Sequence, residues 1–231
     1  MGETLADDYF ESFGPPKNIS PLNSLDKYRF KIFFSNLSAG SILDIGVLFG
    51  GFLKYVRKMD PNRQLFGTEI NEERVKFSNQ ILNENIVRID FKNGLLLSFK
   101  DSNVDNVVCS EVLEHIQDNN IALKELCRVS KTRIIISVPY NEEIFQHHCI
   151  HCWKYTPSYG HIHSYKLNTF DNFIPKGWHI SNRGTFGNII SKFLVRKIDV
   201  YLLISIVEQL SSKLFPNMNS WMYIVLEKDK P

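Results

Sequence analysis

A glycine-rich turn at residues 42–53 constrains the fold of this chain more than any other segment. Its sequence, Ile-Leu-Asp-Ile-Gly-Val-Leu-Phe-Gly-Gly-Phe-Leu, places an apolar pair ahead of an acid, three glycines and an apolar segment with helical spacing. This order is typical of a buried parallel strand that turns sharply into a helix. Glycines there let the backbone approach a ligand closely, and the helix N-terminus presents unpaired N–H groups to it. The segment therefore predicts an α/β fold with a ligand site at the end of its first strand.

The next segment supports a nucleotide-like ligand. Residues 65–69, Leu-Phe-Gly-Thr-Glu, are typical of a second short strand that ends in an acid. A Rossmann-type site binds ribose hydroxyls with an acid roughly 20 residues after the glycines. The spacing Asp44-x-Gly46-x-x-x-Gly50 differs from the Gly-x-Gly-x-x-Gly of dinucleotide sites. We expect Glu69 to be an exposed strand-end acid that binds a ribose and contributes little to stability.

Strands and helices are expected to alternate through residue 140. The predicted strands are 41–45, 64–68, 86–89, 104–109 and 133–138, and the predicted helices are 25–37, 51–59, 71–83 and 117–128. Two further strands, 178–182 and 222–227, flank a helical stretch over 189–214. This alternation predicts a doubly wound, mostly parallel sheet.

Three motifs resemble those of the class I S-adenosylmethionine-dependent methyltransferases, in the type 11/12-like group that acts on small molecules. Asp44, Gly46 and Gly50 match the first motif, with Leu48 in place of its middle glycine. Residues 104–116, Val-Asp-Asn-Val-Val-Cys-Ser-Glu-Val-Leu-Glu-His-Ile, closely resemble the fourth motif, and 93–101 resemble the adenine-binding turn and the stretch after it. The resemblance covers residues 25–140 well and implies a Rossmann-like seven-stranded sheet, mostly parallel, with one antiparallel strand near the C-terminus formed by 222–227.

The resemblance implies an enzyme that binds S-adenosyl-L-methionine. Glu69 would bind the ribose diol, Asp44 the amino-acid portion, Asn93 the adenine amino group (with Asp90 as the alternative), and Ser110 would line the methionine end. The full expected cofactor-binding set is Asp44, Gly46, Val47, Gly50, Glu69, Ile70, Asn93, Gly94, Ser110 and Glu111.

Residues 147–163 hold five of the seven histidines and two of the four cysteines. One interpretation is a zinc site made by Cys149, Cys152 and His161. A rival metal set, Glu111, Glu114, His115 and His161, resembles that of the small-RNA 3′-end 2′-O-methyltransferases. In a third interpretation the histidines line a polar pocket without metal. His161 is also the preferred general base because a neutral imidazole accepts a proton near pH 7, with His163 and Tyr140 as the reserve candidates.

Composition limits the partners. The chain has 231 residues, and 27 Lys plus Arg against 25 Asp plus Glu give a net charge of +2, which argues against a nucleic-acid partner. No apolar signal-type run stands at the N-terminus, so a cytoplasmic protein is expected. The apolar window 193–210 contains Arg196, Lys197, Asp199 and Glu208 and is too polar to span a bilayer. We expect residues 189–214 to pack on the sheet, and in part to cap the acceptor pocket or to form a homodimer contact.

These observations predict one methyltransferase domain over 1–231. Its expected parts are an N-terminal helical cap (1–40), a cofactor-binding core (41–140), a Cys/His-rich acceptor-site insertion (141–175) and C-terminal strands and helices (176–231). The expected reaction is methyl transfer to an oxygen or nitrogen of a small-molecule acceptor. A metal-dependent RNA 2′-O-methyltransferase and a non-catalytic binding protein of the same fold are the alternatives. A ribose-binding acid at position 69 argues against the last of these.

Overall fold

A computed structural model describes residues 21–82, 85–88, 95–148 and 153–230 of the chain. Four expected site residues lie outside the described part, namely Asn93, Gly94, Cys149 and Cys152. The predictions made for them, and for Asp90, stay predictions.

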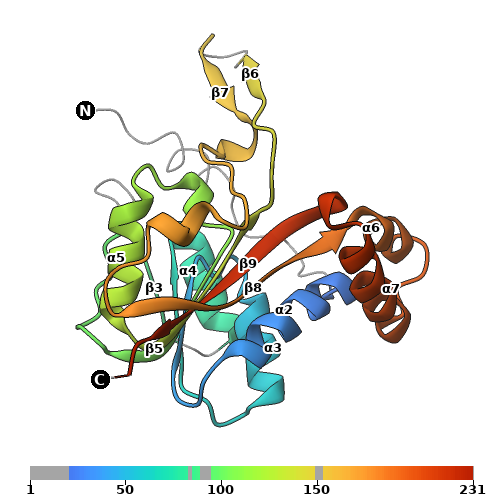
Figure 1. Cartoon of the computed structure of the whole chain (residues 1–231). Coiled ribbons are helices and arrows are strands. Elements are labelled where there is room, and N and C mark those ends of the chain that lie inside the picture. Colours follow the sequence, from blue (N-terminus) through green and yellow to red (C-terminus); the bar gives the residue numbers. More distant parts are fainter. Residues whose placement is uncertain (1–20, 83–84, 89–94, 149–152, 231) are drawn as a thin grey trace.

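A seven-stranded sheet with the order β3-β2-β1-β4-β5-β9-β8 forms the centre of the molecule (Figure 1). Strand β9 runs antiparallel to both of its neighbours, and the contacts among β1 to β5 are parallel. The predicted fold class and the inserted antiparallel strand are therefore confirmed. The strands are β1 (Ile42–Ile45), β2 (Leu65–Glu69), β3 (Asn85–Arg88), β4 (Val104–Ser110), β5 (Ser130–Pro139), β8 (Trp178–Asn188) and β9 (Asn219–Lys228).

Two of the helices begin at a polar side chain that caps them. The Asn23 side chain accepts hydrogen bonds from the first amides of α2, and that of Asp118 does the same for α5. The stretch expected to be helical over 189–214 forms two helices, joined by residues 196–200. The helices are α2 (Ser24–Asn36), α3 (Gly51–Met59), α4 (Glu72–Leu82), α5 (Asn119–Val129), α6 (Ile189–Val195) and α7 (Tyr201–Leu214), with 3₁₀ turns η1 (Leu113–His115), η2 (Ser158–Gly160), η3 (Thr169–Asn172) and η4 (Pro216–Met218).

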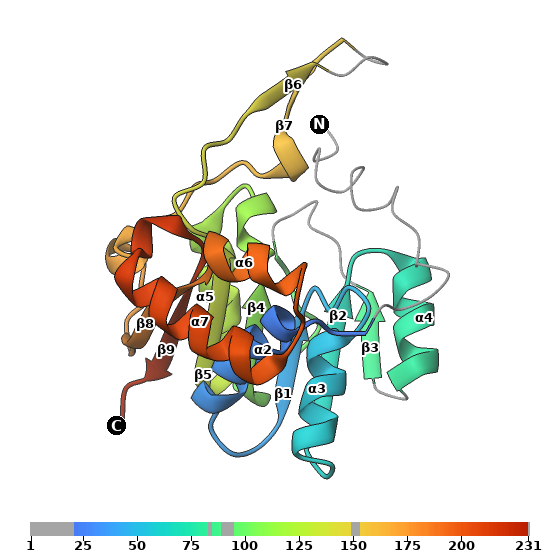
Figure 2. The same cartoon turned by 90° about the vertical axis from the view of Figure 1, so that its right-hand side faces the viewer.

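Two features differ from the sequence-based expectation. Strand β8 continues to Asn188, well beyond the predicted 178–182. A two-stranded hairpin of β6 (Gln146–His148) and β7 (Tyr155–Pro157) was not predicted and projects from the body of the molecule in both views (Figures 1 and 2). All three residues of β6 are exposed, so no apolar alternation marks this strand in the sequence.

Helices cover both faces of the sheet, and neighbouring strand residues divide between them (Figure 1). Leu43 and Ile45 belong to the buried cluster that includes α5, whereas Ile42 belongs to the cluster that includes Phe33 of α2 and Leu53 of α3. Successive side chains of a strand point to opposite faces, so a strand buried on both faces is continuously apolar. This explains the apolar runs from which the parallel strands were predicted.

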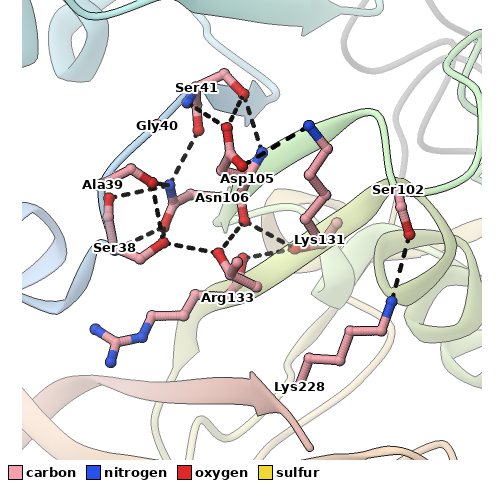
Figure 3. Close-up of polar contacts among 12 residues, drawn as sticks. Ser38, Ala39, Gly40, Ser41, Ser102, Asp105, Asn106, Lys131, Arg133 and Lys228 are labelled. Atoms are coloured by element: carbon pink, nitrogen blue, oxygen red, sulfur yellow. Dashed lines mark hydrogen bonds and ion pairs between the residues drawn. The ribbon is translucent and has the colours of Figure 1, made fainter. Parts of the chain in front are cut away.

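Polar side chains fix the loop that leads into β1 (Figure 3). Asp105 accepts hydrogen bonds from the Ser41 amide and hydroxyl, both at 2.8 Å. The buried Asn106 side chain accepts from the Ser38 amide at 2.8 Å and donates to the Ser41 carbonyl at 3.0 Å. These bonds hold the start of β1 on β4, and thereby set the position of the glycine-rich turn at the other end of β1.

Candidate active site

A cavity of about 1090 Å³ lies at the carboxyl ends of β1, β2, β4 and β5. This is the edge at which ligands bind in open α/β sheets, and the volume lies slightly above the roughly 300–1,000 Å³ of small-molecule sites. Most of the residues expected to bind the cofactor, to act in catalysis or to form the rival metal set line the cavity: Asp44, Gly46, Val47, Glu69, Ile70, Ser110, Glu111, Glu114, His115, Tyr140 and His161.

The glycine-rich turn needs glycine at two positions. Gly46 has φ +74°, and a Cβ there would lie 2.7 Å from a Val112 methyl group. Gly50, the N-cap of α3 with φ +70°, would place a Cβ 2.1 Å from the Leu82 side chain. Both positions combine a left-handed backbone with a close approach, so no other residue fits without rearrangement. The turn thus has the shape that the sequence motif predicts.

Leu48 occupies the place of the motif's middle glycine and takes the same kind of backbone. Its φ is +53°, its side chain is 48% exposed, and its amide donates to the Glu69 carboxylate at 2.8 Å. The loop therefore keeps its course in spite of the substitution, at a cost of roughly 1–2 kcal/mol for a left-handed non-glycine residue.

We expect Leu48→Gly to have a free energy of unfolding about 1 kcal/mol higher than Leu48→Ala, because both changes remove the same exposed side chain and only glycine relieves the backbone. Urea unfolding of the two variants measures the difference. Equal stabilities would mean that the left-handed backbone at position 48 carries no cost.

Glu69 is buried, which corrects the expectation of an exposed strand-end acid. It is 3% exposed, and its carboxylate accepts hydrogen bonds from the amides of Leu48, Ile70 and Asn71. Burial raises the pKa of Glu69, while these amide bonds and the Arg74 guanidinium lower it. The side chain joins the glycine-rich turn to the start of α4, so its removal affects the loop as well as any ligand.

Asp44 belongs to β1, lines the cavity and is 5% exposed. Burial raises its pKa to about 8; Arg29 of α2 opposes this shift, and Glu69 adds to it. Asp44 is therefore largely protonated at neutral pH before a ligand binds. A cationic group bound beside it would favour the carboxylate.

Glu111 turns toward β9. Its carboxylate accepts from the Trp221 indole N–H at 2.8 Å and from the Ser137 hydroxyl at 3.5 Å, and its φ is +56°. Burial raises the pKa of Glu111 to about 7, with Arg29 acting against the shift. Lys192 of α6 lies over the same indole ring, 3.9 Å from its centre, and donates to the Ser220 hydroxyl. This wall of the cavity thus combines a carboxyl group, an indole and an ammonium.

Glu114, His115 and His161 form a compact cluster at the other wall. One potential ligand atom from each lies within 4.8 Å of the others. Glu114 is fully buried, and neither of its carboxylate oxygens has a hydrogen-bond partner among the described residues. Burial raises the pKa of Glu114 well above its usual value, and burial together with His161 lowers the pKa of His115 to about 4. A buried carboxyl group without hydrogen bonds is costly and unusual unless an ion or ligand completes it.

The two imidazoles of the cluster are held by oxygens on their Nδ1 side. His115 Nδ1 lies 3.2 Å from the Gly160 carbonyl, and His161 Nδ1 lies 2.6 Å from a Glu142 carboxylate oxygen. The Ile162 amide also donates to the Glu114 carbonyl at 2.8 Å, which fixes the segment after η2 on η1. Such outer contacts orient histidines that bind metals through Nε2.

The rival metal set is thus brought together in part. Glu114, His115 and His161 meet, whereas Glu111 binds Trp221 instead. Cys149 and Cys152 lie outside the described residues, so the cysteine site stays a prediction. Of the reserve bases, Tyr140 lines the cavity, and His163 instead contacts the Ile116 carbonyl through Nε2 at 2.9 Å.

Several charged or aromatic residues of the cavity were not singled out from the sequence, among them Arg29, Glu142, Lys192 and Trp221. Glu142 follows the expected fifth strand by a few residues, and the rule that ligand sites lie beyond strand carboxyl ends would have indicated it. The other three come from α2, α6 and β9, far from the motifs in sequence, and only the packing of those elements brings them to the cavity.

Comparisons with known proteins agree with this architecture. Residues 43–136 match the family described as "Methyltransferase domain". No curated protein sequence matches the chain. Among solved structures, an S-adenosylmethionine-dependent methyltransferase from Mesorhizobium loti is similar, with 12% identity, a TM-score of 0.61, and coverage of 87% of this chain and 96% of that one.

Two further structures are similar. The [4+2]-cyclase SpnF has 11% identity and a TM-score of 0.64, with coverage of 99% of this chain and 94% of that one. Phosphoethanolamine N-methyltransferase 2 of Haemonchus contortus, solved in complex with S-adenosyl-L-methionine, has 13% identity and a TM-score of 0.57, with coverage of 87% of this chain and 52% of that one. At these identities the structures establish the fold.

The match over residues 43–136 indicates a methyltransferase, and the fold is that of solved S-adenosylmethionine-dependent methyltransferases. The observed cavity fits S-adenosylmethionine: it offers a glycine-rich turn, a buried acid at the end of β2 and a second buried acid within β1.

Proposed function

We propose that this protein transfers a methyl group from S-adenosylmethionine to a hydroxyl oxygen of a small-molecule acceptor, beside a divalent metal ion held by Glu114, His115 and His161. The observation that carries the metal part is the Glu114 carboxyl group, which is buried without a hydrogen bond next to two imidazoles. Imidazole nitrogens with a carboxylate oxygen are ligands that suit zinc or manganese ions.

The cofactor half of the cavity follows the sequence motif. S-adenosylmethionine supplies an already activated methyl group, so the protein mainly has to position two reactants. In this proposal Glu69 accepts hydrogen bonds from the ribose hydroxyls, Asp44 binds the ammonium group, and Ser110 and Glu111 line the methionine end. Gly46, Val47, Gly50 and Ile70 shape the cradle, and Asn93 with Gly94 binds the adenine.

The acceptor half has to remove one proton. A metal ion lowers the pKa of an oxygen bound to it, which favours a hydroxyl acceptor over an amine. Without a metal, His161 would accept the proton, and the Glu142 carboxylate at 2.6 Å would stabilise the resulting imidazolium. His161 cannot be a metal ligand and the general base at the same time. The metal content of the protein distinguishes the two roles.

The remaining predictions form part of the same proposal. The chain would be one methyltransferase domain with the boundaries 1–40, 41–140, 141–175 and 176–231, and it would act in the cytoplasm. A zinc site at Cys149 and Cys152 with His161 is the alternative position for a metal.

RNA 2′-O-methylation is the second candidate. It is favoured by one observation, the meeting of three of the four residues of the rival metal set. The net charge of +2 over 231 residues argues against it, because phosphate backbones are bound by clustered basic residues. The small-molecule acceptor is therefore preferred.

Elemental analysis tests the metal part. Protein purified without chelator or affinity metal is expected to hold about one divalent ion per chain. Glu114→Gln and His161→Ala are expected to lose the ion and to lower kcat at least about 100-fold. Each change removes a metal ligand, and the ion that is then lost no longer helps to deprotonate the acceptor. The control His179→Ala, an exposed histidine that contacts Asp229, is expected to keep both.

The outcomes separate the alternatives. Metal lost in Cys149→Ser but kept in Glu114→Gln would assign the ion to the cysteines. A fully active enzyme without metal would overturn the metal site and leave His161 as the base.

A further inference from the structure

Helices α6 and α7 present an apolar surface to the outside of the molecule. About half of the large apolar side chains that are exposed in the described part of the chain lie between Ile189 and Met218. The most exposed, each at least 54%, define what we call the α6–α7 face: Ile189, Phe193, Val200, Leu202, Leu210 and Leu214. Both helices lie at one side of the molecule in Figure 1 and face the viewer in Figure 2. Exposed apolar patches of this kind mark interaction sites.

The α6–α7 face points outward because the opposite side of α7 packs against the rest of the molecule. Leu202, Leu210 and Leu214 lie on one side at helical spacing, while Ile204, Glu208 and Ser211 are buried on the other. The Glu208 carboxylate accepts hydrogen bonds from the amides of Gly187 and Asn188, which join α7 to the end of β8. The packing on the sheet expected for 189–214 therefore uses the other side of α7 and leaves this one exposed.

Cations surround the α6–α7 face. Arg196, Lys197 and Lys213 are exposed in or between the two helices, and Lys27 is exposed on the neighbouring α2. The acids within 189–214 are Asp199 and Glu208. Glu208 is buried, and Asp199 accepts a hydrogen bond from the Ser24 amide at 2.9 Å and lies near Lys27. The face thus combines apolar side chains with a positive rim.

This charge distribution selects among possible occupants. In a twofold dimer the same patch would face its own copy, so the cationic rim would oppose itself. A bilayer surface rich in anionic lipid is complementary to the rim and also accepts the apolar side chains, as it does for interfacial amphipathic helices. No helix in the described residues is long and apolar enough to cross a membrane. A face that lies on the bilayer, without spanning it, accounts for both properties.

Helix α6 connects the face to the cavity, because it carries both Phe193 of the face and Lys192 of the cavity wall. Lys192 of α6, Arg29 of α2 and Trp221 of β9 all line the cavity wall on this side. A membrane held against α6 and α7 would lie next to the helix that contributes Lys192 to the cavity wall. We propose that the α6–α7 face docks on anionic membrane surfaces and that the methyl acceptor is a lipid-borne hydroxyl compound; the second clause rests on the proposed methyl transfer.

Vesicle sedimentation tests the docking. The full chain is expected to bind vesicles of phosphatidylglycerol and phosphatidylcholine at least tenfold more tightly than vesicles of phosphatidylcholine alone, and high salt should weaken the binding. The double variant Leu202→Asp/Leu210→Asp and the double variant Arg196→Glu/Lys197→Glu are each expected to lower the partition coefficient at least tenfold. Ile121→Asp and Lys124→Glu, exposed positions on α5, serve as matched controls and are expected to bind normally.

Three results would overturn the proposal. Equal binding to both kinds of vesicle would show that the cationic rim does not contribute to docking. No binding to either kind would rule out the membrane as the partner of this face. A dimer in light scattering that Leu202→Asp/Leu210→Asp dissociates would assign the face to a second copy. Calorimetry with S-adenosylmethionine on the same variants keeps the two levels apart, because a failed docking with normal cofactor affinity leaves the methyl-transfer proposal intact.

Discussion

Replacing Glu69 with glutamine is expected to weaken the binding of S-adenosylmethionine about 100-fold, because a buried carboxylate that accepts from ribose hydroxyls contributes roughly 3 kcal/mol. The change keeps the shape of the side chain. It also places an amide near the backbone N–H groups of Leu48, Ile70 and Asn71, so a loss of about 1–2 kcal/mol in the free energy of unfolding is expected as well.

Isothermal titration with S-adenosylmethionine and S-adenosylhomocysteine measures the affinity, and urea unfolding measures the stability. Glu73→Gln is the matched control, an exposed acid in the first turn of α4. An unchanged dissociation constant in a folded Glu69→Gln variant would rule out Glu69 as the ribose ligand.

The parallel core could be predicted because its signals are local. The apolar runs of β1 and β4 and the glycines at 46 and 50 each act within a few residues. Their agreement specifies strand, turn and helix before any long-range contact is known. The edge at which the cofactor-binding residues meet then follows from the topology.

The burial of Glu69 could not be predicted in this way. From sequence the residue is a strand-end acid followed by a polar turn, which suggests exposure. Its burial depends on the amide of Leu48, 21 positions earlier, and on Arg74 of α4, which lies 3.6 Å from the carboxylate. Both partners reach it only when α4 packs beside the glycine-rich turn.

The residue types around His161 could be predicted from the sequence, but the contacts between them could not. The sequence left His161 shared between a cysteine site and a Glu/His site. The 2.6 Å contact with Glu142 and the unsatisfied Glu114 carboxyl group favour the second site in our proposal. These contacts form because the segment after η2 returns to η1, and no local pattern in 141–163 specifies that return.

In our proposal Asp44 binds the ammonium group of the cofactor, and this contact needs the carboxylate form. The affinity for S-adenosylmethionine is therefore expected to rise with pH through neutrality. Burial raises the pKa of this side chain from 3.8 to about 8 in the empty protein. Binding below pH 8 must therefore release a proton, so the dissociation constant is expected to fall by up to about tenfold per pH unit between roughly pH 6 and pH 7.5.

Stability is expected to change in the opposite direction. The folded empty protein holds a proton on Asp44 that the unfolded chain has lost above pH 3.8, so this group stabilises the fold at low pH. That contribution declines as pH rises toward about 8. As pH rises toward about 8, the free energy of unfolding of the protein without cofactor should thus decrease, while its affinity for the cofactor increases.

Titration calorimetry at several pH values, in buffers of different ionisation enthalpy, measures both the dissociation constant and the proton release. Asp44→Asn is expected to bind the cofactor at least about 100-fold more weakly at pH 7.5 and to show no pH slope, since the amide neither ionises nor pairs with an ammonium group. Asp60→Asn, a change at an acid that follows α3 and does not line the cavity, should leave the slope unchanged. A pH dependence of the dissociation constant that persists in Asp44→Asn would mean that another group of the cavity titrates. Glu111, with its pKa raised to about 7, would then be the next residue to replace.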